Sequence, residues 1–281
     1  MATAAEQETK RDGEAILWTL LAIAALAEVT DRDVAAAALL WSRRAPTAAR
    51  GLVYAGSNRS PYRWDQRQLR YINPTGTRVS LSAVKQQVNT FVDDMAGDLA
   101  DLTGQMNAGK LPINAWQTTM AQTVKRVHLA VDIVAQGGVD QIDQADVTRM
   151  TANVDYQLRK LLEFSRSLAD LGSDRVRIPD QKAIDRARLY AETARTQYEA
   201  SVAQSWADLA STGVTVEMRN ILDPVADHCE SSGAVPGCLD EDKRGWVPFG
   251  TMSLPGRRVC GAFRCKCGVD YRRIDRRPNL N

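Results

Sequence analysis

The chain has 281 residues, of which 44% are hydrophobic and 25% are charged. This is the composition of a globular protein and excludes a disordered or fibrous one. Aromatic residues make up only 6%, and the abundance of Ala, Leu and Val favours packed helices over a β-sandwich. The formal net charge of +2 points to no particular class of partner.

The first apolar segment, residues 15–29, predicts a buried or partner-facing helix. It is too short to cross a bilayer, which takes roughly 20 apolar residues, and it lacks the basic region and cleavage site of a secretory signal. We therefore expect no contact with a membrane. The five cysteines would be made in a reducing cytoplasm, where metal binding is more common than disulfide formation.

The N-terminal part predicts one or two alanine-rich helices between Glu14 and Arg43, with Thr30 as the N-cap at a break. Residues 45–77 are then rich in Gly, Pro, Asn, Ser and Arg. Connections of this length are uncommon inside compact domains. We interpret this segment as an extended arm that becomes ordered against a neighbouring subunit, with Trp64 in the contact.

Four long helices are predicted in the middle of the chain. Apolar residues recur every three or four positions in three successive segments after residue 80. These segments end at Gly109, at Gly137-Gly138 and at Gly172. A fourth helix opens at Pro179 and runs to about residue 211. Because the connections are short, we expect an antiparallel helical bundle.

The predicted fold is therefore mainly α, with an antiparallel helical bundle, a long extended arm and a small cysteine-rich C-terminal module. Residues 1–44 would form the N-terminal helices, 45–79 the extended arm or loop, 80–213 the bundle, and 214–281 the cysteine-rich module with its basic tail.

The C-terminal module contains all five cysteines and one of the two histidines. Gly, Pro and Asp dominate the spacers, so the segment buries too little apolar surface to fold without a cross-link. Zinc would supply one, because it binds four N or S ligands in a tetrahedron. The candidate ligands are His228, Cys229, Cys238, Cys260, Cys265 and Cys267. Six candidates exceed four places, and disulfides or uncoordinated buried thiols remain as alternatives.

A catalytic site is a weaker interpretation of the same residues. Cys229 directly follows His228, but adjacent residues seldom place a thiol and an imidazole in hydrogen-bond geometry. The sequence contains no HExxH, no GxxxxGK[ST] and no GxSxG. We expect a protein that is not an enzyme, with a cysteine-dependent hydrolase as a minor alternative.

The C-terminal end is the basic pole of the chain. Eight basic and two acidic residues lie between Arg257 and Arg277, a local charge of +6. Clustered arginines give salt-dependent affinity for nucleic acid, and the candidate contacts are Arg272, Arg273, Arg276 and Arg277. A solvated terminus and an arginine-rich protein interface are the alternatives.

The order of short motifs in this region resembles the C-terminal signature of tailed-phage head morphogenesis, or minor head, proteins. The motifs are Asp227-His228-Cys229, Trp246-Val247-Pro248, Leu254-Pro255-Gly256, Cys260-x4-Cys265-x-Cys267 and Asp270-Tyr271-Arg272. Less specific similarity extends back to about residue 65. The chain departs from the pattern at Ser232, where a second cysteine is expected shortly after Cys229.

The resemblance implies a structural virion protein of the capsid or portal region, made in the host cytoplasm. Such a protein would act by assembly with other virion proteins and with itself. The alternative function is that of a zinc-stabilised nucleic-acid-binding protein, which would contact DNA, including packaged DNA, through its basic tail.

Overall fold

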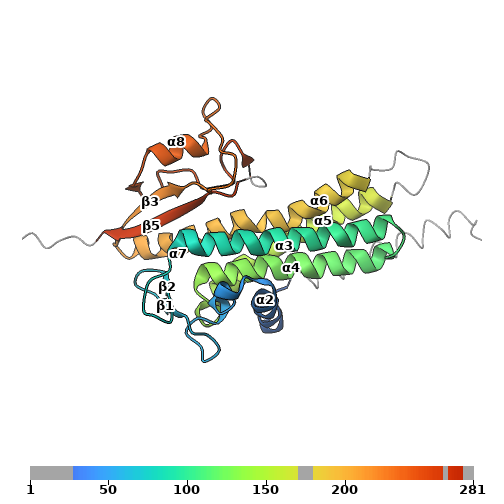
Figure 1. Cartoon of the computed structure of the whole chain (residues 1–281), viewed down its shortest axis with the longest axis horizontal. Coiled ribbons are helices and arrows are strands. Elements are labelled where there is room, and N and C mark those ends of the chain that lie inside the picture. The colour runs from blue at the N-terminus through green and yellow to red at the C-terminus, as the bar shows by residue number, and fades with distance from the viewer. Residues whose placement is uncertain (1–27, 170–179, 262–264, 275–281) are drawn as a thin grey trace, which may run out of the picture.

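The computed structural model describes residues 28–169, 180–261 and 265–274. These residues form a mainly helical protein with a small sheet region near one end (Figure 1), so the predicted helical class is confirmed. The described α-helices are α2 (Asp31–Arg44), α3 (Leu81–Asn107), α4 (Ile113–Gln136), α5 (Gln144–Ala169), α6 (Asp180–Glu192), α7 (Ala194–Ser211) and α8 (Cys238–Lys243).

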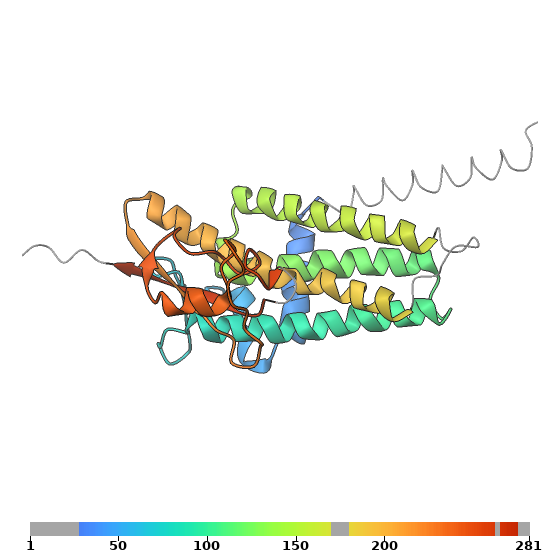
Figure 2. The ribbon, with the colours of Figure 1, turned by 90° about the horizontal axis from the view of Figure 1, so that it is seen from above.

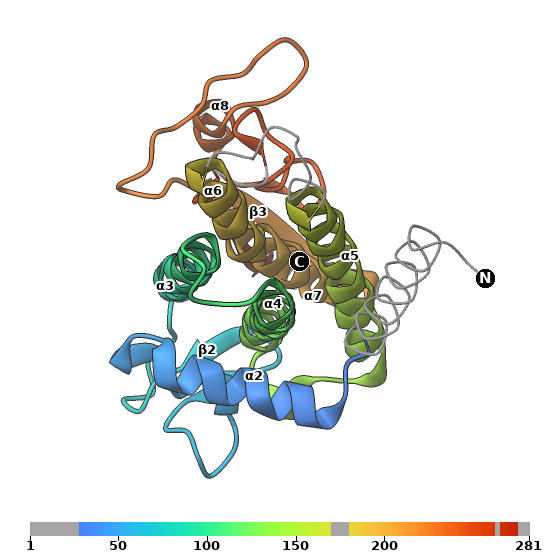
Figure 3. The ribbon, with the colours of Figure 1, turned by 90° about the vertical axis from the view of Figure 1, so that its right-hand side faces the viewer.

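Helix α2 begins where the sequence placed its N-cap. The Thr30 hydroxyl accepts a hydrogen bond from the Asp33 N–H, and the Asp33 carboxylate accepts one from the Thr30 N–H. This reciprocal capping box satisfies donors that the first turn leaves without a partner. The helix lies across α4 (Figure 3), and its buried Trp41 ring packs 4.7 Å from the Phe91 ring of α3. The rest of the predicted N-terminal helices lies outside the described residues.

Helices α3, α4, α5 and the α6–α7 pair run beside one another along the molecule (Figure 2). Their predicted apolar positions form the core, with Phe91, Trp116 and Phe164 completely buried. The predicted fourth helix is divided at Thr193, whose hydroxyl donates to the Tyr190 carbonyl at 3.0 Å. This side-chain bond competes with the helical ladder and accounts for the interruption. The predicted stop at Gly172 lies outside the described residues.

Residues 45–79 differ from the predicted extended arm. They contain 3-10 turns at Thr47–Ala49 and Leu52–Tyr54 and an antiparallel hairpin of β1 (Arg63–Asp65) and β2 (Arg70–Ile72). This segment packs on the helices of its own chain, because it contains apolar side chains that need burial. Val53 and Tyr71 are buried.

Trp64 also lies against its own chain and not on an open surface. Its ring is 4.8 Å from the Tyr71 ring, and the Tyr71 hydroxyl donates to the Val134 carbonyl of α4 at 2.6 Å. These contacts attach the hairpin to the end of α4. The tryptophan that the sequence suggested for an intersubunit contact is therefore half-buried inside the protomer.

The C-terminal region contains a three-stranded antiparallel sheet that the sequence did not predict. Its strands are β3 (Thr215–Ile221), β4 (Val247–Pro248) and β5 (Gly268–Ile274), in the order β4-β3-β5. Met218 and Tyr271 are partners across β3 and β5, and both are buried. The Tyr271 ring stacks on Trp206 of α7 at 5.6 Å. The sheet therefore shares the apolar core of the helices.

An ion pair joins this sheet to two helices. The ammonium of Lys85 on α3 lies 2.9 Å from the Glu199 carboxylate on α7, and both side chains are buried. The same carboxylate accepts a hydrogen bond from the Val269 N–H of β5 at 3.1 Å. Helices α3 and α7 and strand β5 thus meet at one carboxylate.

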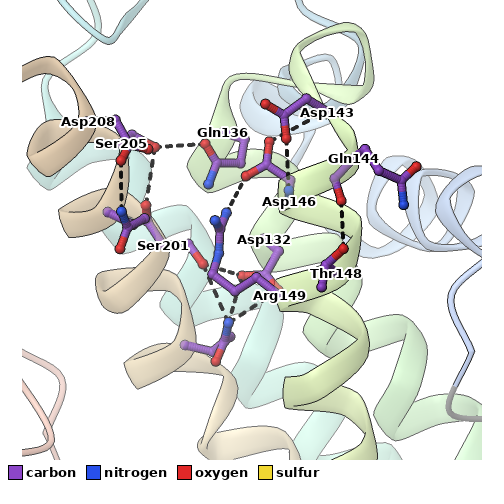
Figure 4. Close-up of polar contacts among 12 residues, drawn as sticks. Asp132, Gln136, Asp143, Gln144, Asp146, Thr148, Arg149, Ser201, Ser205 and Asp208 are labelled. Carbon is purple, nitrogen blue, oxygen red and sulfur yellow. Dashed lines mark hydrogen bonds and ion pairs between the residues drawn. The ribbon is translucent and has the colours of Figure 1, made fainter. Parts of the chain in front are cut away.

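Polar side chains also form a buried row between α4 and α7, part of which appears in Figure 4. The Ser201 hydroxyl donates to Asp132 at 2.5 Å and the Ser205 hydroxyl donates to Gln136 at 2.7 Å. One turn earlier on α4, the His128 ring lies 3.0 Å from the Tyr190 carbonyl. Burial raises the pKa of Asp132 to about 6 and lowers the pKa of His128 to about 4.

These two groups have opposite effects on the pH dependence of stability. The unfolded His128, with a pKa of 6.5, takes up a proton before the folded one does, so stability falls from pH 6.5 to about 4. The buried charge of Asp132 is unfavourable above its folded pKa. That penalty is relieved as the pH falls from about 6 to the unfolded value of 3.8.

In the Asp132→Asn variant, we expect the loss of stability caused by His128 at low pH to be no longer offset by Asp132. Between pH 7 and pH 5 the variant's free energy of unfolding should fall by about 2 kcal/mol, while the wild type loses under about 1 kcal/mol. His128→Gln should instead gain about 1 kcal/mol over the same interval. Urea unfolding followed by circular dichroism at the two pH values checks this. Parallel pH profiles for all three proteins would contradict it, since the other titrating groups are shared.

A second prediction concerns the glycine that follows α4. Gly137 has a φ of +98°, and a Cβ there would overlap the Trp64 ring. Gly109, after α3, has a φ of +71° with open space around it. We expect Gly109→Ala to cost about 1 kcal/mol of unfolding free energy, for backbone strain alone. Gly137→Ala should cost about 2 kcal/mol more, because Trp64 must move. Equal losses in urea unfolding would show that Trp64 does not pack on Gly137.

Candidate metal centre

The five cysteines come together beside the sheet, from three separate parts of the chain. Cys238 opens α8, Cys229 lies in the loop before it, and the other three precede β5. Strands β3 and β5 lie between α8 and α7 in Figure 1, so the centre stands at the outer end of the C-terminal region. All five cysteines are free thiols.

Cys238 is at the middle of the cluster. Its sulfur lies 3.5 Å from that of Cys229, 3.6 Å from that of Cys260 and 3.9 Å from that of Cys265. The sulfurs form two groups, Cys229–Cys238–Cys260 and Cys238–Cys265–Cys267, each with all members within 4.8 Å of one another.

His228 stands at the edge of the cluster. Its Nδ1 lies 3.5 Å from the Cys267 sulfur. The structure therefore brings all six candidate ligands together. Among the described residues, Cys267 is the one cysteine that His228 contacts.

The spacing of these atoms fits metal ligands. Zinc–sulfur bonds of about 2.3 Å in a tetrahedron place the sulfurs about 3.8 Å apart, and the distances around Cys238 run from 3.5 to 3.9 Å. A disulfide would need about 2.05 Å. Thiolate-rich donor sets suit zinc, copper(I) and iron, so the residues could hold a metal ion whose identity the geometry leaves open.

A buried arginine supports the sulfur at the middle. Arg258 is almost completely buried, and its Nη1 lies 3.8 Å from the Cys238 sulfur. Its guanidinium also donates to the Asn220 carboxamide oxygen at 2.6 Å and to the Ser253 carbonyl at 2.7 and 2.9 Å. Asn220 in turn donates to the Cys238 carbonyl at 3.0 Å. Hydrogen bonds of this kind hold a metal ligand in position.

Sequence analysis missed this support. It counted Arg258 as one more cation of the basic tail, and it assigned no role to Asn220. The one available signal was that this arginine lies two residues before Cys260, and it did not distinguish Arg258 from the adjacent Arg257.

The pKa values of two of these cysteines are shifted by their neighbours in the cluster. Hydrogen bonds from the Cys238 and Cys267 thiols lower the pKa of Cys265 well below its usual value, with a further contribution from Arg258. Burial, and then the negative charge of Cys265, raise the pKa of Cys260. Metal ligation requires the thiolate form of each cysteine, so metal affinity should fall as the pH falls.

The predicted nucleic-acid residues lie elsewhere on the sheet, and only two of the four are described. Arg272 forms an ion pair with Glu217 at 2.6 Å and lies 4.3 Å from the centre of the Trp246 ring. Arg219 lies over the same ring at 4.7 Å. Arg273 is also on β5. Arg276 and Arg277 are outside the described residues.

Within the described residues, no helix is both long enough and apolar enough to cross a membrane.

Comparison of the chain with protein-family models, with curated proteins and with solved structures gave no match. The resemblance to tailed-phage minor head proteins therefore rests on the short motifs quoted above.

We expect Arg258→Met to weaken metal binding. The substitution removes the cation beside Cys238 and leaves the Asn220 oxygen without a donor. Loss of such support typically lowers metal affinity about 10- to 100-fold. Competition with a chromophoric chelator measures the affinity. Arg257→Met is the matched control, because the Arg257 side chain is exposed, and it should leave the affinity unchanged. Equal affinities for the two variants would contradict a role for Arg258.

Proposed function

We propose that this protein is a structural component of a tailed-phage head, a minor capsid or portal-associated head morphogenesis protein. It acts by assembly and not by catalysis. One observation carries the proposal: the motifs that resemble that family, spread from residue 227 to residue 272, lie together in one small unit that is joined to a long helical body.

Several of the motif residues have a mechanical role in that unit. The Arg219 and Arg272 guanidiniums both lie against the Trp246 ring, at 4.7 and 4.3 Å from its centre. Val247–Pro248 forms β4 and pairs with β3. Asp270 accepts from Arg70 of the hairpin at 2.7 Å, which attaches the unit to residues at the other end of the sequence. These contacts make the C-terminal unit rigid, as we expect of a structural protein that binds other virion proteins.

We further propose that the metal of the cysteine centre is zinc and that its role is structural. The two sulfur groups have the spacing of tetrahedral ligands, and the outer loops around them contain few aliphatic side chains. Zinc would supply the cross-link that apolar burial does not supply there.

The helices would act as an antiparallel bundle that presents long surfaces to partners. Those partners are other copies of this chain and the capsid or portal proteins of the virion, with packaged DNA as a further contact. Three large apolar side chains are exposed on the described helices: Leu39 on α2 at 44%, Ile113 at the start of α4 at 38% and Tyr156 on α5 at 54%. We propose that Leu39 and Tyr156 contact partner proteins in the assembly. The protein would be made in the host cytoplasm and end in the virion.

Analytical ultracentrifugation of the purified full-length protein, alone and mixed with purified portal and capsid proteins, tests the assembly proposal. We expect association, and we expect Leu39→Asp or Tyr156→Asp to weaken it roughly tenfold, because a buried charge at an interface is costly. Val225→Asp is the control, since this residue is 86% exposed and belongs to a loop rather than to a helix. A protein that stays monomeric and ignores both virion proteins would overturn the proposal.

A second candidate function is nucleic-acid binding through the basic tail. The observation that favours it is that Arg219 and Arg272, each 47% exposed, lie against an aromatic ring on one face of the sheet. The test is the salt dependence of DNA affinity, with glutamine in place of Arg272, Arg273, Arg276 and Arg277. A steep dependence that these substitutions abolish would support this function, and an unchanged affinity would exclude the tail as the site.

A further inference from the structure

The cysteine centre contains more ligands than one ion needs. A tetrahedral metal ion takes four donors, yet the chain places five thiols and one imidazole together. A single ion could be bound by Cys238 together with the three cysteines whose sulfurs lie nearest to it, Cys229, Cys260 and Cys265. In that case neither Cys267 nor His228 would be a ligand, and their contact would be unexplained. That contact measures 3.5 Å, close to the roughly 3.6 Å that separates a sulfur and a nitrogen ligand on one tetrahedral zinc.

Two of the sulfurs lie between the two groups. Cys238 belongs to both groups. Cys265 is in the second group, and its sulfur also forms a hydrogen bond with Cys260 of the first. The other donors lie to one side or the other, with Cys229 and Cys260 on the first side and Cys267 and His228 on the second.

We propose that the centre holds two metal ions that share the thiolates of Cys238 and Cys265. Cys229 and Cys260 complete the tetrahedron of the first ion. Cys267 and His228 complete the tetrahedron of the second. Two terminal ligands for each ion and two shared ligands use all six donors, and each ion has four. This inference rests on the proposed structural metal centre and adds the number of ions and the bridges.

The buried charge favours two ions over one. Five thiolates and two divalent ions carry a net charge of −1, which the buried Arg258 beside Cys238 balances. One divalent ion with four thiolates carries −2, so the same arginine would leave −1 without compensation. Cys238, Cys265 and Cys267 are buried, and an uncompensated charge beside buried ligands is costly. Arg258 is therefore matched to a cluster with five thiolates.

The first experiment counts ions. The full chain, purified under reducing conditions and supplied with zinc, is analysed by native mass spectrometry and by elemental analysis. We expect two zinc ions per chain. One ion per chain would overturn the two-ion centre and leave the proposed single-metal module standing. No bound ion would overturn both.

The second experiment tests the bridges. After exchange of zinc for ¹¹³Cd, two cadmium resonances coupled to each other through shared sulfur are expected. Two resonances without mutual coupling would mean separate sites and would overturn the bridging role of Cys238 and Cys265.

Single substitutions distinguish shared from terminal ligands. Cys267→Ser removes a ligand of the second ion only, so we expect it to lower the count from two ions to one. Cys238→Ser removes a ligand of both ions and should release both. Ser232→Ala, at an exposed position in the same loop region, is the control and should retain two ions. Retention of both ions by Cys238→Ser would overturn the bridge.

Discussion

The buried ion pair between Lys85 and Glu199 determines how the two parts of this protein fit together. Each charge would be very unfavourable alone in the core, and loss of one partner from such a pair costs about 3–5 kcal/mol. Glu199 also accepts the Val269 N–H, and the absence of a side chain at Gly268 allows the strand to approach, since a Cβ there would lie 3.1 Å from the carboxylate. The position of β5 on α3 and α7 therefore depends on this carboxylate. Strand β3 and the metal centre follow, because β3 pairs along the whole of β5.

The two parts are held by different physical means. The helices bury one continuous apolar core, which also includes Met218, Val269 and Tyr271 from the sheet. The cysteines form a separate small cluster, with Leu222 as its partly buried aliphatic neighbour. If the cysteines hold a metal ion, its removal should thus affect the outer loops around α8 much more than the sheet or the helices. This division is consistent with a module whose outer surface is fixed by a cross-link and whose inner surface is part of the main fold.

The sequence predicted what depends on local patterns. Apolar spacing indicated the long helices, Thr30 indicated a cap, and the rarity of cysteine drew attention to all six candidate ligands. Strands β3 and β5 were missed because they pair across about fifty residues of chain, and alternation in a single seven-residue strand is a weak signal. The extended arm is not established, since Tyr71 is buried and its hydroxyl donates to a carbonyl of α4 that is distant in sequence. Arg258 and Asn220 were missed for the same reason, since only the folded loops place them against Cys238.

The structure also changes the meaning of the basic C-terminal charge. The local excess counted from the sequence suggested a surface for phosphates, yet several of its cations have partners inside the chain. Arg258 is buried beside Cys238, Lys266 lies 3.2 Å from Asp93, and Arg272 is paired with Glu217. A phosphate would have to compete with these contacts. Within the described residues, these three cations therefore connect the cysteine module to its own sheet and helices.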